Sequence, residues 1–261
     1  LQEGELVLRT VEDAVALRAR LSAASSVVVI GAGFLGLEVA TAAAGAGASV
    51  CVVDPDPPLQ RLLGEHLAGL LVERAVWAGI TFHRGPAALV GEPVGGVRLA
   101  DGSVIEADAV VSCVGDVPAS GWLDGTALAS PHGIEIDGEA RTVLPGVYAA
   151  GDVAAVRRNG VLSRGPFWAN AVAQGRVAAA GVLGHRPAHG VVDHYFWTDL
   201  AGVQVKAVGA LPLRGRPTVL EDGGDGTGLL AWEGQAVVAL GIKRSVPRLR
   251  KDAQQLGIVT P

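Results

Sequence analysis

Three glycines in the stretch GAGFLG have the spacing of a dinucleotide-binding turn. Gly31, Gly33 and Gly36 follow a β-branched run and open an Ala-rich segment of helical character, with Phe34 between the last two glycines. Such glycines permit a tight turn, let the backbone approach a pyrophosphate and let the helix pack closely on the strand. Free N–H groups at the helix start would face the phosphates. The stretch predicts a dinucleotide site, although a glycine turn also serves simply to pack a helix on a sheet.

An acidic residue follows at the place where such a turn requires one. Asp54 ends the next apolar run, and its carboxylate can accept hydrogen bonds from the 2′-hydroxyl of an adenosine ribose. At an effective dielectric of about 20, contact with a 2′-phosphate would cost up to about 4 kcal/mol, which favours NAD over NADP. Arg61 is the nearest arginine along the chain that could neutralise such a phosphate. The alternative is a solvated turn acid before PDPP.

Two further carboxylates, Asp152 and Glu38, are candidate ligand-binding residues. Asp152 follows small residues in GVYAAGDVA, and the carboxyl end of a strand is where open α/β sheets bind their ligands. A Gly-Asp surface turn would explain Asp152 equally well. Glu38 lies on an otherwise apolar helix face two residues past Gly36, and a buried carboxylate needs a partner.

Hydrophobic periodicity and turn residues outline the elements that position these groups. The patterns alternate between helix and strand over most of the chain, which predicts an α/β fold. The predicted elements are a helix at 11–21, a βαβ unit at 25–54, a helix at 65–79, an antiparallel meander at 86–106, a buried strand at 107–115, a short strand at 146–154, a helix at 165–184, strands within 194–212 and 228–242, and a helix at 248–257. A composition shift at 185–190 marks a domain boundary.

Composition narrows the class of protein. The chain has 261 residues, is 49% hydrophobic and carries a net charge of −5, which argues against general nucleic-acid binding. No apolar run is long enough to span a membrane and no signal peptide is visible, so we expect a cytoplasmic protein. Cys51 and Cys113 lie far apart in strand-like runs and predict small buried thiols, with no metal site. Because the sequence contains no Met, we expect further residues upstream of Leu1.

A set of motifs in a particular order resembles one enzyme family. The motifs are VLRTVEDAVALRARL, VVVIGAGFLGLEVA, GVRLADGSVIEADAVVSCVG, GVYAAGDVA, WANAVAQG and YFWTD. They resemble FAD-dependent ferredoxin reductases of the pyridine nucleotide-disulfide oxidoreductase superfamily, in the branch that serves Rieske oxygenases and cytochromes P450. The resemblance implies Rossmann-like three-layer nucleotide-binding domains with a small C-terminal α+β domain. It assigns 1–115 to the NAD-binding domain and its linker, 116–188 to the C-terminal part of the FAD-binding domain, and 189–261 to an interface domain.

The same resemblance implies roles for individual residues. Asp152 would hydrogen-bond the ribityl chain of FAD, and Glu38 would lie near the nicotinamide and flavin N5, paired with a lysine that this sequence does not show. The remaining implied cofactor contacts are Arg9, Phe34, Gly115, Gly151, Trp168 and Trp197. The superfamily's first GxGxxG, for the ADP part of FAD, has no counterpart before Gly31. The family often has an acid where Pro166 stands and a Gln where Leu200 stands.

The resemblance implies an NADH-dependent FAD flavoprotein reductase that passes electrons to a 2Fe-2S ferredoxin-type protein. A basic surface would speed encounter with an acidic partner. The candidate cations are Lys243, Arg244, Arg248, Arg250 and Lys251, together with Arg157, Arg158 and Arg164. Two alternatives remain: an NADH oxidase or coenzyme A disulfide reductase, and a nucleotide-binding module or remnant without flavin turnover.

Overall fold

The computed structural model describes residues 1–128, 130–158 and 160–258. They form two compact units. Unit 1 comprises Leu1–Gly115, Trp197–Lys206 and Ala210–Leu249, and unit 2 comprises Asp116–Phe196, Ala207–Gly209 and the C-terminal segment from Arg250.

A parallel five-stranded sheet forms the centre of the first part of unit 1. Its order is β1-β8-β2-β3-β4, and every neighbouring pair is parallel. The strands are β1 (Glu5–Leu6), β2 (Ser26–Ile30), β3 (Ser49–Asp54), β4 (Ile80–Arg84) and β8 (Ala109–Ser112). Val27, Val28 and Val29 are almost completely buried, as expected for a strand covered on both faces. The predicted βαβ unit is confirmed, and the carboxyl ends of β2 and β8 lie side by side.

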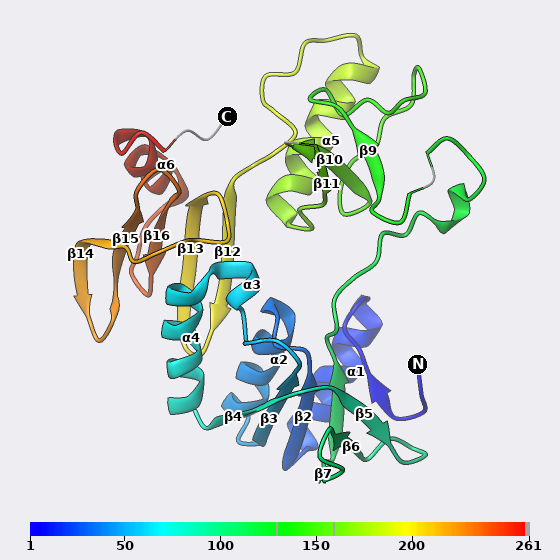
Figure 1. The fold of residues 1–261 in the computed structure, drawn as a ribbon, viewed down its shortest axis with the longest axis vertical. Helices are drawn as coiled ribbons and strands as arrows, with labels where there is room; N and C mark the ends of the chain where they lie inside the picture. Colours follow the sequence, from blue (N-terminus) through cyan, green and yellow to red (C-terminus); the bar gives the residue numbers. More distant parts are fainter. Residues whose placement is uncertain (129, 159, 259–261) are drawn as a thin grey trace. The chain divides into compact units, whose positions relative to one another are not determined.

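Helices α1 (Val11–Ala23), α2 (Phe34–Gly45), α3 (Gln60–Leu63) and α4 (Glu65–Trp77) accompany this sheet, and α2 packs on β2 and β3 (Figure 1). Helix α1 begins with a capping box, because the Thr10 hydroxyl accepts from the Asp13 N–H and the Asp13 carboxylate accepts from the Thr10 N–H. A small antiparallel sheet follows β4. It is formed by β5 (Ala87–Val90), β6 (Gly96–Leu99) and β7 (Val104–Glu106), which confirms the meander predicted over 86–106.

A second five-stranded sheet lies mostly in unit 1. Its order is β12-β13-β16-β15-β14, formed by β12 (Tyr195–Leu200), β13 (Val203–Gly209), β14 (Thr218–Gly224), β15 (Thr227–Trp232) and β16 (Ala236–Leu240), and helix α6 (Val246–Gln255) follows it. Strand β14 is absent from the sequence prediction. All of its residues are exposed at the sheet edge, so it carries no alternating apolar pattern.

Unit 2 contains the small sheet β11-β10-β9 and helix α5 (Trp168–Val182). Its other elements are β9 (Ile134–Ile136), β10 (Ala154–Arg158), β11 (Val161–Ser163) and the 3₁₀ turn η1 (Gly121–Leu123). The strand predicted over 146–154 is wrong for most of its length. Before Ala154 this segment makes only an isolated bridge between Tyr148 and Arg141, because no second extended segment continues the ladder beside it in the described chain.

The elements confirm the predicted α/β class with an added C-terminal sheet and helix. Among the residues that the structure describes, no helix combines the length and apolar character needed to cross a membrane.

Candidate dinucleotide site

Gly31 and Gly36 are required by the protein's own packing. Gly31 has a φ of 104°, and a Cβ placed on it would overlap the carbonyl group of Cys113. A Cβ on Gly36 would overlap the carbonyl oxygen of Gly31. These two glycines therefore allow the close contacts between the turn, helix α2 and the end of β8. By themselves they would be explained by helix packing alone.

Gly33 differs from them, because nothing in the fold demands a glycine there. Its backbone is extended, with φ −78° and ψ −171°, and a Cβ on it would meet only Leu62 at an ordinary distance of 3.8 Å. Gly33 is the N-cap of α2, and no side chain caps that helix. The first turn of a helix has N–H groups without intrahelical partners, which suit an anionic phosphate. The open space above Gly33 is what a bound pyrophosphate would need.

Asp54 lies against this turn, as its spacing predicts. Its Oδ2 accepts a hydrogen bond from the N–H of Ala32 at 2.6 Å, and its Oδ1 accepts from the N–H of Asp56 at 2.7 Å. The carboxylate thus ties the end of β3 to the glycine turn. A carboxylate offers about four acceptor positions, so room remains for ribose hydroxyls.

One basic residue near Asp54 was missed from the sequence. Arg84 on β4 is the residue paired with Asp54 across the parallel ladder, and its Nε donates to the carbonyl of Pro55 at 3.4 Å. Arg61, the arginine nearest along the chain, is exposed on α3. Only the register between β3 and β4, which the sequence does not display, brings Arg84 beside the acid.

The turn that follows β8 completes the site. The N–H of Cys113 donates to the carbonyl of Ile30 at 2.7 Å, which places this turn beside the glycine turn. Gly115 has a φ of 100° and no atom within 4 Å of the position of a Cβ. The nearby side chains of Leu35 and Val114 are partly or largely exposed. The carboxyl ends of β2 and β8 therefore present open backbone at Gly33 and Gly115 and exposed apolar side chains, a composition that suits a ligand site.

Glu38 has a partner, and it is not a lysine. The half-buried carboxylate of Glu38 accepts a hydrogen bond at 2.5 Å from the hydroxyl of Thr198, which belongs to the FWTD motif on β12. Thr198 is 2% exposed. Phe34, one helical turn earlier, is partly buried at the start of α2.

In unit 2, the turn that contains Gly151 and Asp152 is held from two sides. The N–H of Gly151 donates to Oε1 of Gln174 at 2.8 Å, and Arg164 donates to the carbonyl of Asp152 at 3.0 Å. Arg164 also pairs with Asp116 at 2.5 Å. The Asp152 side chain is exposed, and within the described chain no group hydrogen-bonds its carboxylate. A well-held turn with an open carboxylate suits a hydroxyl-bearing ligand.

The other predicted flavin contacts lie in both units. Trp168, in unit 2, is the first residue of α5 and is 68% exposed. Trp197 and Arg9 lie in unit 1: the former on the outward face of β12 at 39% exposure, the latter exposed just before α1. Their roles at a flavin stay predictions.

The two cysteines are free and partly buried. Burial raises the pKa of the Cys113 thiol to about 11, and it also raises the pKa of Cys51. Both thiols are therefore protonated at neutral pH, and neither has the thiolate character of a redox nucleophile.

Comparison with known proteins agrees with this geometry. Residues 2–175 match the pyridine nucleotide-disulphide oxidoreductase family, which covers well over half of the chain. The chain belongs to this family. The matched range contains the glycine turn, Asp54 and the Gly151–Asp152 turn.

Two curated relatives of this chain are named as reductases. The chain is 32% identical over 238 residues to terpredoxin reductase from a Pseudomonas species, covering 88% of this chain and 58% of that protein. It is 31% identical over 203 residues to the ferredoxin-NAD(+) reductase component of the p-cumate 2,3-dioxygenase system of Pseudomonas putida, covering 77% and 50% respectively. The chain thus spans about half the length of the curated relatives it matches.

Among solved structures, the chain is similar to the ferredoxin reductase for the CYP199A2 system from Rhodopseudomonas palustris. The TM-score is 0.80 at 29% identity, covering 90% of this chain and 61% of that one. The covalent putidaredoxin reductase-putidaredoxin complex gives a TM-score of 0.82 at 25% identity, covering 97% and 63%.

Proposed function

We propose that the chain is the NADH-binding and electron-delivering part of an FAD-dependent ferredoxin reductase. The observation that supports the proposal is the glycine at position 33, which packing does not require and whose backbone lies open next to a helix start without a side-chain cap, as a pyrophosphate would need. The reductase relatives and the similar reductase structures support the same reading.

The residues present fit NADH in several respects. The first turn of α2 would hold the pyrophosphate, and Asp54 would accept from the ribose hydroxyls while disfavouring a 2′-phosphate. For FAD, the carboxylate of Asp152 would accept from the ribityl hydroxyls, and Trp168 of the same unit would line the flavin. A flavin contact of Trp197, which belongs to unit 1, stays a separate prediction. Bound NADH would supply a hydride and bound FAD would accept it and release electrons singly. The chain's own contribution is orientation of the two cofactors, since neither thiol is activated.

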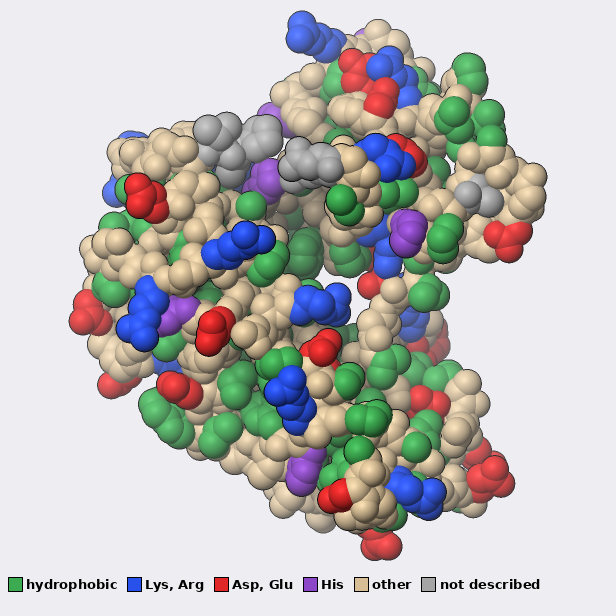
Figure 2. All heavy atoms as spheres, in the orientation of Figure 1, with side chains coloured by type: hydrophobic (Ala, Val, Ile, Leu, Met, Phe, Trp, Pro, Cys, Tyr) green, Lys and Arg blue, Asp and Glu red, His purple; other side chains and the backbone are tan. Residues whose placement is uncertain are grey.

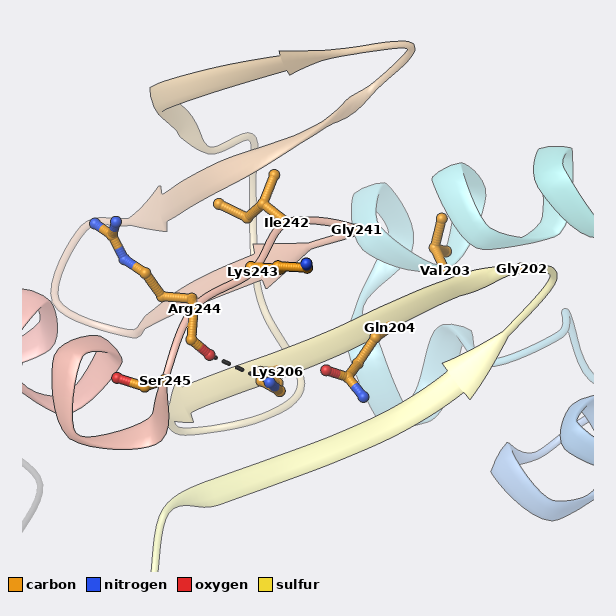
Figure 3. Close-up of a pocket in the computed structure, with 9 residues that line it drawn as sticks. All are labelled: Gly202, Val203, Gln204, Lys206, Gly241, Ile242, Lys243, Arg244 and Ser245. Carbon is orange, nitrogen blue, oxygen red and sulfur yellow. Dashed lines mark hydrogen bonds between the residues drawn. The ribbon is translucent and has the colours of Figure 1, made fainter.

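An acidic iron-sulfur protein is the partner that the C-terminal sheet suits best. A groove of about 420 Å³ lies between the start of β13 and the 241–245 turn (Figure 3). Its described lining contains Lys206, Lys243 and Arg244 and no acidic residue. Lys206 donates to the carbonyl of Arg244 at 3.2 Å, and Arg244 pairs with Glu221, which lies outside the lining, at 3.3 Å. Lys243 is exposed. The cations therefore gather in this groove, in a chain whose net charge is −5.

Two other predicted docking cations already form ion pairs within unit 2. Arg157 pairs with Glu135 at 2.6 Å and Arg250 with Asp193 at 2.7 Å. The side chain of Arg158 lies outside the described part of the chain. Figure 2 shows basic and acidic side chains interspersed over the face of unit 1 that it draws. We therefore restrict the docking proposal to the groove around Lys206 and Lys243. Screening by salt would slow encounter there.

Cofactor content and electron transfer test this function. The purified protein should carry the visible absorbance of oxidised flavin, either as isolated or after incubation with FAD and removal of the unbound FAD. NADH should bleach this absorbance. A reduced flavin should then reduce a 2Fe-2S ferredoxin in a salt-dependent manner. A colourless protein that binds NADH but never FAD would contradict the reductase proposal and favour the nucleotide-binding module. A cytoplasmic location is part of the proposal and is tested by cell fractionation.

A further inference from the structure

Two polar pairs join helix α2 to strand β12 and the turn after it. The hydroxyl of Thr198 donates to Oε1 of Glu38 at 2.5 Å, and the N–H of Ala201 donates to the hydroxyl of Thr41 at 3.0 Å. Glu38 and Thr41 are three residues apart, so they lie on the same face of α2. All four residues belong to unit 1. The nucleotide-binding helix and the second sheet are thus connected by side-chain hydrogen bonds from one helix face.

The position of Thr198 is built for this hydrogen bond. Along β12 the buried residues are Phe196, Thr198 and Leu200, whereas Trp197 and Asp199 point outward. A hydroxyl buried to this extent needs a partner, and Glu38 supplies a charged one, which gives a short and strong bond. A valine would fill the same space without a polar atom. The hydroxyl of Thr198 is therefore explained by the carboxylate it contacts.

Glu38 also has an unused acceptor. Thr198 occupies Oε1, and within the described part of unit 1 no hydrogen bond reaches Oε2. Glu38 lies in the second turn of the helix whose first turn would receive the pyrophosphate. Of the two halves of NADH, only the nicotinamide side carries a carboxamide, whose NH₂ group donates hydrogen bonds. A carboxylate with one oxygen held and the other open suits that donor.

We propose that Thr198 is a positioning residue of the nicotinamide subsite: it holds Glu38 so that the free carboxylate oxygen accepts from the carboxamide of NADH. This inference rests on the proposed function. Without the Thr198 hydroxyl, Glu38 would spread over several side-chain rotamers, and ordering it again would oppose nicotinamide binding. The ADP half of the cofactor, held by the glycine turn and Asp54, would be unaffected.

Binding of NADH and of ADP-ribose, which lacks the nicotinamide, separates positioning from general loosening. Thr198→Val should weaken NADH binding about tenfold and leave ADP-ribose binding unchanged, a difference of about 1.4 kcal/mol. Thr198→Ser, which restores the hydroxyl, should restore NADH affinity. Both affinities are measured by calorimetric titration of the full chain, with melting temperatures recorded alongside.

Thr41→Val is the matched control, because it removes the other polar pair between α2 and the β12 turn without touching Glu38. It should leave the ratio of NADH to ADP-ribose affinity as in the wild type. In a Glu38→Ala background, Thr198→Val should have no further effect on NADH affinity, because Thr198 acts through Glu38.

Three results would overturn the inference. The first is an unchanged NADH affinity in Thr198→Val. The second is an equal loss for NADH and ADP-ribose, particularly if Thr41→Val shows the same loss. The third is a full additional loss in the Glu38→Ala background. A wild-type chain that binds neither molecule would refute the proposed function itself, and with it the inference. A wild type that binds both but fails one of the first three tests refutes only the inference.

Discussion

Replacing Gly33 by alanine isolates the contact between backbone and pyrophosphate from the stability of the fold. A Cβ on Gly33 meets only Leu62 at 3.8 Å, and the φ of −78° is ordinary for an L-residue. The protein should therefore accept the methyl group without strain. A bound pyrophosphate would not, because the methyl group would stand between it and the N–H groups of the first turn of α2. We expect a folded protein with impaired dinucleotide binding.

The magnitude follows from the interactions that would be lost. Displacing the diphosphate weakens its attraction to the helix N-terminus by about 1 kcal/mol. It also lengthens at least one hydrogen bond to a charged group, which contributes about 2 kcal/mol. The sum of about 3 kcal/mol corresponds to a roughly hundredfold larger dissociation constant for NADH. ADP-ribose binding should fall by the same factor, because the lost contact belongs to the pyrophosphate.

Two other glycines of the same helix serve as controls. Gly45→Ala places its methyl group in open space at the far end of α2 and should leave NADH binding unchanged, with a stability gain of at most about 1 kcal/mol. Gly36→Ala forces a Cβ into the carbonyl of Gly31 and should lower the free energy of unfolding by about 3 kcal/mol. Calorimetric titration and urea unfolding of the three variants give both quantities. If Gly33→Ala bound NADH as tightly as Gly45→Ala does, the space above Gly33 would not be a pyrophosphate site.

Three further predictions concern single side chains. Asp54→Arg, beside Arg84, should shift the preference toward NADPH, because it removes a carboxylate that repels a 2′-phosphate; an unchanged ratio of NADH to NADPH affinity would count against the role of Asp54. The raised pKa of Cys113 contributes a stability that is complete below about pH 9 and is lost as pH rises toward about 11. In urea unfolding, the wild type should therefore lose up to about 2 kcal/mol of its free energy of unfolding over this pH range, and Cys113→Ala should not. Equal losses in both proteins would show that the Cys113 thiol is not the source. Arg164→Met leaves the exposed Asp116 without its ion-pair partner and should destabilise unit 2 by about 1 kcal/mol, partly recovered in combination with Asp116→Asn. Full additivity of the two changes would show that the pair is not coupled.

The sequence was most informative where local rules decide the structure. The βαβ unit at its glycine turn, the meander and helices α4 and α5 follow from periodicity and turn residues within short windows. Strand β14 could not be predicted in this way, because its exposed residues are ordered only by pairing with β15. The segment before Ala154 was predicted as a strand because its residues are apolar. It forms no strand, because the described chain places no neighbouring strand beside it.

The candidate site divides along the same line. Gly31, Gly33, Gly36 and Asp54 were identified from spacing alone, because a strand, a turn and a helix in succession place them together. The partners of Asp54 come from the same βαβ unit and the turn that follows it, whereas the partner of Glu38 comes from a distant part of the chain. Thr198 lies 160 positions from Glu38 in the sequence, and no residue pattern within α2 predicts their hydrogen bond. Such contacts depend on how the second sheet packs on the helix, so they become visible only in the folded structure.

The three acids of the candidate sites differ in how many acceptors they retain, and this difference bears on what each can do. Asp54 accepts backbone hydrogen bonds at both oxygens, so part of its role is to shape the glycine turn, and its preference against a 2′-phosphate comes from charge. Glu38 has one oxygen held and one open, the arrangement of an oriented acceptor. Within the described chain both carboxylate oxygens of Asp152 lack a hydrogen-bond partner, while Arg164 donates to its carbonyl and Gln174 accepts from the N–H of the preceding Gly151, so a ligand could supply donors to both oxygens. A carboxylate held at one oxygen loses little entropy when a donor arrives at the other, whereas one that is free must still be ordered. Under the proposed function, Glu38 is therefore the acid whose contribution to affinity would depend on a single distant hydroxyl, and Asp152 is the acid whose carboxylate the ligand itself would have to order.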